Sequence, residues 1–283
     1  MNAKKGKDGI RFIMVEIDTS KCIRCGECVR DCVAGTLQTG ADGFPHFLKE
    51  WEDCCLHCQH CLAVCPSGAV SCDGRKDSDC VPAGPLPGGA EMRNLLRQRR
   101  SIRFFRNENV SPEILSKLKE SLHWSPTGCN DHRLFFSVVE DREAMDWFRG
   151  EAAKRLKILW KTGILRVIYP KSRNHVREIL DGKDLIFRDA PHLIVASTPW
   201  NAPCAESDPL IALSYFDLYA QSLGLGTCWC GFAWHLFRWS GKMRKRLGLP
   251  PGYRPGAVLL FGMPDISYPR ATAPIPFEIR SLF

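Results

Sequence analysis

Apolar positions in the C-terminal two thirds of the chain follow helical and strand periods in turn. Helix-like spacing predicts helices at 91–99, 111–123, 142–160, 172–181 and 208–223. Short apolar runs rich in β-formers predict strands at 134–139, 192–198 and 257–262. Ser111-Pro112-Glu113 is typical of a helix start, because serine caps the first turn and proline fits it. Helices interspersed with few strands predict an α+β domain, since a doubly wound fold needs more strands.

The first 75 residues lack these periods and contain an internal repeat. The pattern that begins at Cys22 recurs at Cys55, 33 residues later, which predicts a small pseudo-symmetric domain. The stretch at 73–90, DGRKDSDCVPAGPLPGGA, is rich in Pro and Gly and has no apolar period, as a linker does. We therefore expect one domain at 1–75, a linker at 76–90 and a second domain at 91–283.

Composition narrows the class of protein. The chain has 283 residues, of which 45% are hydrophobic and 25% are charged, as in ordinary globular proteins. No apolar stretch approaches the roughly 20 residues of a membrane-spanning helix, and no apolar region follows the basic N-terminus, so we expect a cytoplasmic protein. The net charge is +8, but its basic residues are dispersed, which argues against nucleic-acid binding. Fifteen cysteines, many spaced for metal, favour a reducing compartment.

Two cysteine runs share the spacing C-x2-C-x2-C-x3-C. Three closely spaced thiolates on a tight loop reach one iron–sulfur cubane, while the fourth cysteine starts a helix that points away and ligates the other cluster. This predicts two [4Fe–4S] clusters. The first is held by Cys22, Cys25, Cys28 and Cys65, and the second by Cys55, Cys58, Cys61 and Cys32.

The alternative interpretation of these runs is zinc. Four-coordinate zinc has no use for a third cysteine two residues further on, twice over. The region 14–75 resembles the two-cluster bacterial ferredoxins. It departs from them at Val33, which follows the fourth cysteine of the first run, whereas Pro66 follows the fourth cysteine of the second run. The remaining cysteines of the chain outside the Cys228-Trp-Cys230 pair are interpreted as bystanders: Cys54, Cys72, Cys80, Cys129 and Cys204.

Arginines cluster at 99–103, in Arg99-Arg100-Ser101-Ile102-Arg103. Guanidinium groups offer planar forks of donors to phosphate oxygens, and a serine hydroxyl adds another donor. The segment therefore suits a flavin phosphate, and a solvated basic helix end is the alternative.

Four motifs occur in the order seen in the nitroreductase family, and the resemblance covers about 91–283. They are R-R-S-x-R-x-F at 99–105, S-P-T-G-x-N at 125–130, G-L-G-T-C-W-x-G at 224–231 and G-x-P at 262–264. The resemblance implies a mixed sheet flanked by helices and a homodimer in which both subunits contribute to each FMN pocket.

The resemblance also implies roles for single residues. Arg99, Arg100, Ser101 and Arg103 would hold the phosphate and ribityl chain, with Arg270 as a second phosphate anchor. Pro126, Thr127, Gly128 and Asn130 would pack beside the flavin ring or hydrogen-bond it, while Cys230 and Gly231 would place backbone N–H groups near N5.

Two features of the motifs leave alternatives open. Asn130-Asp131-His132-Arg133 replaces the usual N-x-Q-P, so the substrate side of that loop is undefined. His132 is either a proton donor over the flavin or a plain hydrogen-bonding residue. Cys228 and Cys230 are near neighbours with poor geometry for a disulfide, so we do not expect a redox pair there.

The two halves together predict an oxidoreductase that passes electrons from the clusters to FMN and on to a small planar electrophile, such as a nitroaromatic or quinone. Reductive dehalogenation and ene reduction are alternatives within the enzymes. An electron-transfer or redox-sensing protein with a protein partner is the alternative outside them. The donor would be a ferredoxin-like protein or NAD(P)H. Basic residues of the first domain would either steer an acidic donor or be solvated surface charge; they are Lys4, Lys5, Lys7, Arg11, Lys21, Arg24 and Arg30.

Overall fold

The computed structural model describes residues 15–163 and 173–282. The chain divides into two compact units, of which the first comprises the residues up to Leu86 together with Cys129–Asp131. The second comprises Pro87–Gly128 and the residues from His132 onward. The first division falls between Leu86 and Pro87, inside the stretch predicted as a linker. Lys4, Lys5, Lys7 and Arg11, the predicted basic residues of the N-terminus, lie outside the described residues.

The first unit is built from two antiparallel strand pairs and two short helices that follow the cysteine runs. β1 (Val15–Ile17) pairs with β4 (Val70–Cys72), and β2 (Leu37–Thr39) pairs with β3 (Pro45–Phe47). The helices are α1 (Glu27–Asp31) and α2 (His60–Ala63), accompanied by the 3-10 helices η1 (Lys49–Cys54) and η2 (Asp77–Asp79). The small core consists of apolar side chains and cysteines from these elements: Val15, Cys28, Leu37, Leu62, Val70 and Cys72.

The repeat in the sequence is also a repeat of backbone conformation. Arg24 and His57 have φ of 58° and 53°, and the next such pair, Gly26 and Gln59, has φ of 75° and 60°. Both pairs are separated by 33 residues, so each cysteine loop turns through the left-handed region at the same two places. Left-handed backbone is costly for residues other than glycine, and it persists only where the surrounding structure imposes it.

The second unit contains a four-stranded sheet with the order β5-β6-β8-β7. Its strands are β5 (Phe135–Val139), β6 (His192–Pro199), β8 (Tyr253–Gly262) and β7 (Gly226–Trp229), and every ladder between them is antiparallel. The sheet gains a parallel component from an isolated bridge between Ser101 and Thr227. This bridge brings the arginine segment to the edge strand β7.

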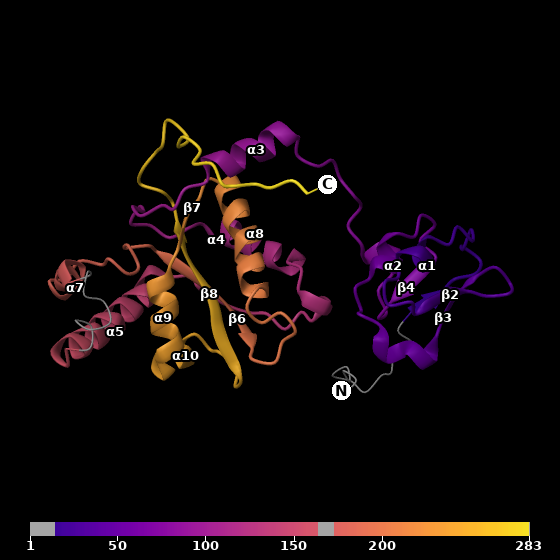
Figure 1. Ribbon diagram of the computed structural model, residues 1–283, viewed down its shortest axis with the longest axis horizontal. Coiled ribbons are helices and arrows are strands. Elements are labelled where there is room, and N and C mark those ends of the chain that lie inside the picture. The colour runs from indigo at the N-terminus through magenta and orange to yellow at the C-terminus, as the bar shows by residue number, and fades with distance from the viewer. Residues whose placement is uncertain (1–14, 164–172, 283) are drawn as a thin grey trace. The chain divides into compact units, whose positions relative to one another are not determined.

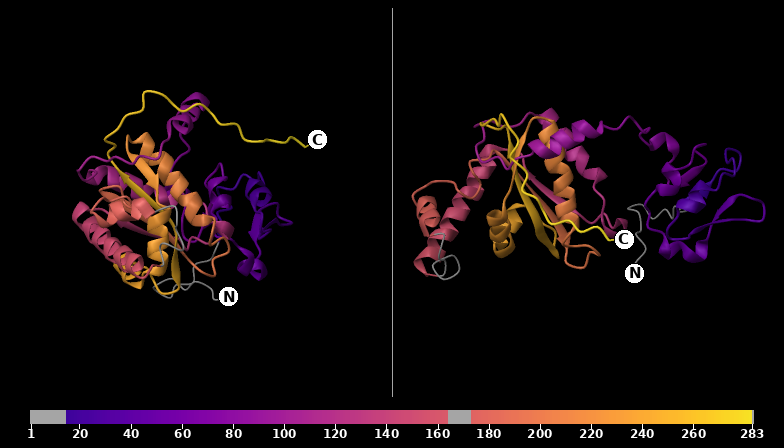
Figure 2. Two further views of the ribbon diagram at one scale, coloured as in Figure 1. Left: turned by 60° about the vertical axis from the view of Figure 1, so that its left-hand side comes forward. Right: turned by 45° about the horizontal axis from the view of Figure 1, so that its top comes forward.

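Helices cover both faces of this sheet (Figures 1 and 2). All eight residues of β6 are buried, and alternate side chains enter different cores. Leu193 and Val195 belong to a core that includes residues of α5 and α9. Ile194 and Ala196 belong to a second core that includes residues of α4 and α8. A strand buried on both faces is expected to be rich in apolar residues, as the centre of this one, Leu193–Ala196, is.

The five helices and three strands predicted for this unit are confirmed. Ser111 caps α4 as expected, since its hydroxyl accepts a hydrogen bond from the N–H of Ile114 at 3.4 Å. The strand β7 and two further helices were not predicted. The helices of the unit are α3 (Gly89–Gln98), α4 (Pro112–Ser121), α5 (Arg142–Lys161), α7 (Arg173–Leu180), α8 (Asp208–Ser222), α9 (Gly231–Trp239) and α10 (Gly241–Arg246).

Candidate redox centres

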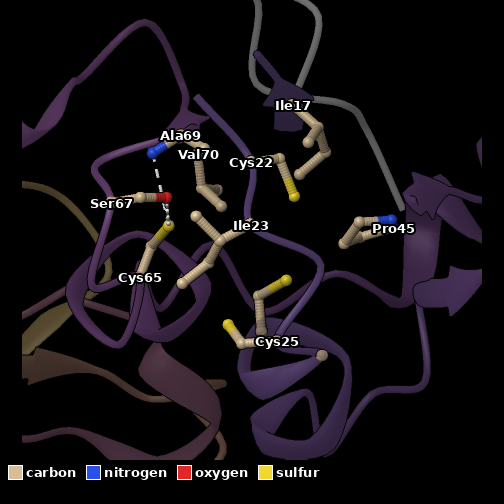
Figure 3. A pocket seen from close by; sticks show the side chains of 11 residues that line it. Ile17, Cys22, Ile23, Cys25, Pro45, Cys65, Ser67, Ala69 and Val70 are labelled. Carbon is tan, nitrogen blue, oxygen red and sulfur yellow. Dashed lines mark hydrogen bonds between the residues drawn. The ribbon is translucent and has the colours of Figure 1, made fainter. Parts of the chain in front are cut away.

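Four cysteines of the first unit line one pocket. They are Cys22, Cys25, Cys28 and Cys65, the set that crosses between the two sequence runs. Figure 3 shows Cys22, Cys25 and Cys65 around a common space, with Ile17, Ile23 and Val70 forming apolar walls. The side chains therefore gather as the first predicted cluster requires.

A second pocket is lined by Cys32, Cys55, Cys58 and Cys61, the other crossed set. It contains one cysteine more, Cys72, which lies outside the repeated spacing and is not the bystander that the sequence predicts. Leu37 and Val15 contribute apolar wall to this pocket. Each pocket thus draws three thiols from one run and one thiol from the other.

The fourth cysteine of each run has a similar hydrogen-bonding environment. Cys65 accepts from the N–H of Ala69 at 3.2 Å, and Cys32 lies 3.3 Å from the hydroxyl of Thr36. Burial alone would raise the pKa of both thiols, but hydrogen bonds from neighbouring backbone and hydroxyl groups bring each pKa below its ordinary value. A thiol that deprotonates readily is suited to bind metal, because the thiolate is the ligand.

The donor set fits a cluster better than a single ion. Within residues 15–163 and 173–282, no three His, Cys, Asp or Glu side chains converge closely enough to hold one metal ion. The cysteines surround a space instead of meeting at a point, and sulfur is the ligand that iron–sulfur clusters use. The residues present therefore fit two cubanes, with no histidine or carboxylate ligand needed.

In the second unit, the arginine segment lies between two motifs distant in sequence. The N–H of Ile102 donates to the carbonyl of Thr227 at 2.8 Å, which fixes the segment to β7. The backbone N–H of Arg106 donates to the carbonyl of Met263 at 2.8 Å, and the backbone carbonyl of Phe104 accepts from the N–H of Asp265 at 2.9 Å. Three of the four sequence motifs thus meet at one edge of the sheet.

Two glycines make this close approach possible. A Cβ on Gly226 would lie 2.6 Å from the Ile102 side chain, and one on Gly262 would lie 2.5 Å from Pro191 and 3.3 Å from Phe105. Such contacts are shorter than side chains tolerate, so only glycine allows the arginine segment to lie this close to β7 and β8.

Two guanidinium nitrogens at this edge are buried and make no hydrogen bond to the residues that the structure describes. They are Nη1 of Arg99 and Nη2 of Arg100. A buried donor without an acceptor is costly, and arginine donors match phosphate oxygens in geometry and charge. The segment therefore fits the phosphate of a nucleotide-like cofactor. Ser101 is half-buried beside them, whereas Arg103 and Arg270 are exposed.

The buried carboxylate of Asp217, in α8, contacts residues at this edge of the sheet, and no sequence motif points to it. Its Oδ2 lies 3.6 Å from Nη1 of Arg99 and accepts from Nε1 of Trp229 at 3.1 Å, while its Oδ1 accepts from the hydroxyl of Thr227. Its side chain is 5% exposed. The available signal was one acidic residue inside an otherwise apolar helical stretch, because buried carboxylates occur almost only with partners.

The T-C-W-C-G segment leads from β7 into α9. Cys230 caps this helix, since its sulfur accepts from the N–H of Ala233 at 3.4 Å while its thiol donates to the carbonyl of Ile186 at 3.2 Å. Its backbone N–H donates to Val258, which leaves Gly231, the first residue of α9, as the better candidate for a ring-facing donor.

Cys228 and Cys230 are both free thiols with separate partners. Burial raises the pKa of Cys230 to about 12. The neutral thiol therefore dominates near pH 7, which agrees with the expectation that the two cysteines are not a redox pair.

The second-unit part of the S-P-T-G-x-N segment is tied to the start of α8. The N–H of Gly128 donates to Asp208 at 3.0 Å, at the N-terminal end of α8, whereas Asp217 lies nine residues further along that helix. At a rise of 1.5 Å per residue, Asp208 and Asp217 are about 13 Å apart along the helix. Within the first unit, Asn130 donates to the carbonyls of Leu56 at 2.9 Å and His57 at 3.0 Å.

Other predicted residues of this loop are placed as follows. Thr127 is half-buried, and its hydroxyl accepts from the N–H of His132 at 3.0 Å. His132 itself has a left-handed φ of 47° and is exposed, as is Pro126.

None of the helices in the described residues combines the length and the apolar character that a membrane span requires.

These features define the class. The model of the nitroreductase family matches residues 96–263, and the chain belongs to that family. A model of the 4Fe-4S dicluster domain matches residues 21–70, which contain both cysteine runs. The family match contains three of the four motifs on which the resemblance rested and ends inside the fourth, at residue 263.

Similar proteins agree with this assignment. A nitroreductase with bound FMN from Desulfitobacterium hafniense DCB-2 is 26% identical, has a TM-score of 0.51, and covers 67% of this chain and 98% of its own. An FMN-dependent nitroreductase from Clostridium difficile R20291 shares the fold, at 22% identity and a TM-score of 0.53 over 69% of this chain and 100% of its own. An iodotyrosine deiodinase from Thermotoga neapolitana is 25% identical over 182 residues, 62% of this chain and 90% of that protein.

Proposed function

We propose that this protein is an iron–sulfur flavoenzyme that passes electrons from two [4Fe–4S] clusters to FMN and on to a small electrophilic acceptor such as a nitroaromatic or quinone. The observation that carries the proposal is the presence, in one chain, of two crossed four-cysteine pockets and of a buried arginine site without acceptors. The FMN named for the Desulfitobacterium hafniense relative supports the identity of the flavin.

Each cofactor would be held by residues placed above. The first cluster would be bound by Cys22, Cys25, Cys28 and Cys65, and the second by Cys32, Cys55, Cys58 and Cys61. When bound, the clusters supply single electrons and the flavin converts them into transfers of one or two electrons. Arg99, Arg100 and Ser101 would orient the flavin phosphate, and the N-terminus of α9 at Gly231 would present a backbone donor to the ring.

The loop at 126–130 supports a homodimer. The resemblance to the nitroreductase family implies that both subunits contribute to each flavin pocket, and this loop lies about 13 Å along α8 from the arginine site, by the helical rise. We infer that Pro126, Thr127 and Gly128 complete the pocket of a second copy, and that Asn130 and His132 lie at its substrate side. The oligomer would then be part of the active site.

A second candidate function is reductive dehalogenation, which the likeness to an iodotyrosine deiodinase favours. The two candidates differ in substrate class, since a deiodinase must hold a zwitterionic amino acid and a nitroreductase need not. The arginine site and cluster pockets serve both. Substrate turnover therefore decides between them.

The test begins with protein purified without oxygen and assayed for iron, acid-labile sulfide and FMN. Two cubanes and one flavin imply about eight irons and one FMN per chain. The loaded protein is then given reduced ferredoxin or NAD(P)H as donor, with a nitroaromatic, a quinone or 3-iodotyrosine as acceptor. Turnover of the first two supports the proposal, and release of iodide supports the second candidate. Rapid exchange with a redox protein without turnover of any small acceptor would indicate an electron carrier instead.

A further inference from the structure

The second cluster pocket contains a fifth cysteine. Cys72 is the last residue of β4, where its pairing with Val15 of β1 holds it in register. Its side chain lines the same pocket as Cys32, Cys55, Cys58 and Cys61, and the residue is 1% exposed. A fully buried thiol among four thiol ligands is chemically equivalent to them.

Cys72 also lies against one particular ligand. Its thiol and that of Cys61, in α2, line this pocket together and lie near enough for each to affect the other. The backbone of Cys72 is fixed by a pair of hydrogen bonds with Arg75, both at 3.0 Å, so the thiol is held in this position. Either sulfur of the pair is therefore close to the place where Cys61 would meet an iron atom.

Among the described residues, no fifth cysteine lines the first pocket. In the repeat, Cys61 corresponds to Cys28, and Cys72 corresponds to Thr39, which is exposed. The described residues that line the first pocket include four cysteines and, beside Cys65, Ser67. The two pockets thus differ by one thiol, and each serves as a control for the other.

We propose that Cys72 is an alternative ligand of the second cluster, able to take the place of Cys61. In the exchange, the iron–sulfur bond to Cys61 breaks and one to Cys72 forms, while the thiol proton of Cys72 passes to the sulfur of Cys61. Iron keeps its coordination number and no electrons are gained or lost. The inference rests on the cluster assignment in the proposed function.

Iron analysis of four variants tests the exchange. Cys61→Ala should keep the iron and sulfide content of the parent protein, because Cys72 completes the ligand set. Cys28→Ala should lose one cluster, half of the iron, since no thiol replaces it. The double variant Cys61→Ala/Cys72→Ala should also lose half, and Cys72→Ala alone should keep all. Loss of half of the iron in Cys61→Ala would overturn the proposal.

A second measurement applies if Cys61→Ala does not yield folded protein. In the parent, Cys72 would capture an iron whose bond to Cys61 opens, and so would slow cluster loss to a chelator. Cys72→Ala, with its full iron content, should lose half of its iron several-fold faster than the parent, while Cys80→Ala, a change at an exposed cysteine, should not. Equal rates in all three would contradict the exchange.

The two hypotheses fail separately. Parent protein without iron would refute the cluster assignment itself. Parent protein with a full iron content, together with a Cys61→Ala variant that loses half, would refute only the role of Cys72. Electron paramagnetic resonance of the reduced Cys61→Ala protein should in addition show one altered and one unaltered cluster signal.

Discussion

At the scale of single residues, the arginine site is defined by two donors that the described protein leaves without acceptors. A hydrogen bond to a charged group contributes about 1.5–3 kcal/mol, which corresponds to roughly a 10- to 100-fold change in affinity. Arg100→Ala should therefore raise the Kd for FMN by that factor. Quenching of FMN fluorescence on titration of the apoprotein measures it.

Arg106→Ala is the matched control for this change. Its guanidinium is exposed and pairs with Glu108 at 3.8 Å, although its backbone belongs to the same segment. Its Kd for FMN should equal that of the parent. Equal affinities in parent and Arg100→Ala would show that the phosphate binds elsewhere.

The thiol of Cys230 gives a second prediction at this scale. With its pKa raised to about 12 by burial, it should remain protonated and resist alkylation at pH 8 in the folded protein. Iodoacetamide followed by mass spectrometry should label exposed cysteines such as Cys80 and leave Cys230 unlabelled until denaturant is added. Rapid labelling of Cys230 in native protein would revive a redox role for it.

Most of the chemistry could be predicted at the residue scale, because spacing alone carries it. The eight cluster cysteines gather in two pockets since a fixed 2-2-3 spacing imposes the loop. Cys72 and Asp217 could not be predicted in the same way. The first lies outside the repeated spacing, and the partners of the second come from segments distant in sequence, so only tertiary structure brings them into contact.

At the scale of elements, the strands β6 and β8 were predicted because each contains a continuous apolar run that is buried, Leu193–Ala196 in β6 and Ala257–Phe261 in β8. β7 and α9 were missed for a shared reason. β7 is four residues long and begins at a glycine required by the approach of Ile102, and α9 is capped by a cysteine, which is not a usual capping residue. At this edge, close packing and an unusual capping residue take the place of the residue types from which strands and helices are predicted.

His192, the first residue of β6, should make the stability of the fold depend on pH. It is fully buried, with Nε2 accepting from the N–H of Val110 at 2.9 Å and Nδ1 lying 3.2 Å from the carbonyl of Val139. Burial lowers its pKa below the ordinary value of 6.5. The unfolded chain therefore binds a proton more readily than the folded one.

It follows that the contribution of His192 to the free energy of unfolding is constant above about pH 6.5 and falls below it, by up to about 1.4 kcal/mol per pH unit until the lowered pKa is reached. Urea unfolding of the parent and of His192→Gln at pH 7.5 and pH 5.5 measures this. The parent should lose more stability than the variant between the two pH values. A larger loss in the variant would contradict the assignment.

Asp217 of α8 should also contribute to stability. Its removal leaves Thr227 and Trp229 without their shared acceptor and takes away the buried carboxylate that pairs with Arg99, and removing one member of such a network typically costs about 3 kcal/mol. Asp217→Ala should lower the free energy of unfolding by about that amount. Asp146→Ala removes an exposed partner of Arg149 and should cost less than about 1 kcal/mol. Similar losses in both variants would show that Asp217 has no special role.

At the scale of the whole molecule, the sequence predicted two parts with different chemistry, and the family and dicluster-domain matches confirm both classes. The acceptor could not be predicted, because a fold does not determine a substrate and the loop after Asn130 departs from the family pattern. The homodimer stays a prediction from the family resemblance, because an interface is a property of surfaces that no motif describes.

The position of the 126–130 loop leads to a prediction about assembly. If that loop completes the pocket of a second copy, the FMN-loaded protein should sediment with twice the mass of one chain. Thr127→Ala should weaken FMN binding without changing that mass. A monomer that binds FMN at full affinity would contradict the shared pocket.

The central claim is that electrons reach the flavin through the clusters, and the most direct measurement is the rate of flavin bleaching by reduced ferredoxin in the absence of oxygen. We expect rapid bleaching in the parent and in Cys80→Ala, and its loss in Cys25→Ala and Cys58→Ala proteins that still bind FMN. Bleaching at the parental rate in those two variants would show that electrons bypass the clusters and would leave the cysteine-rich unit a structural or docking element.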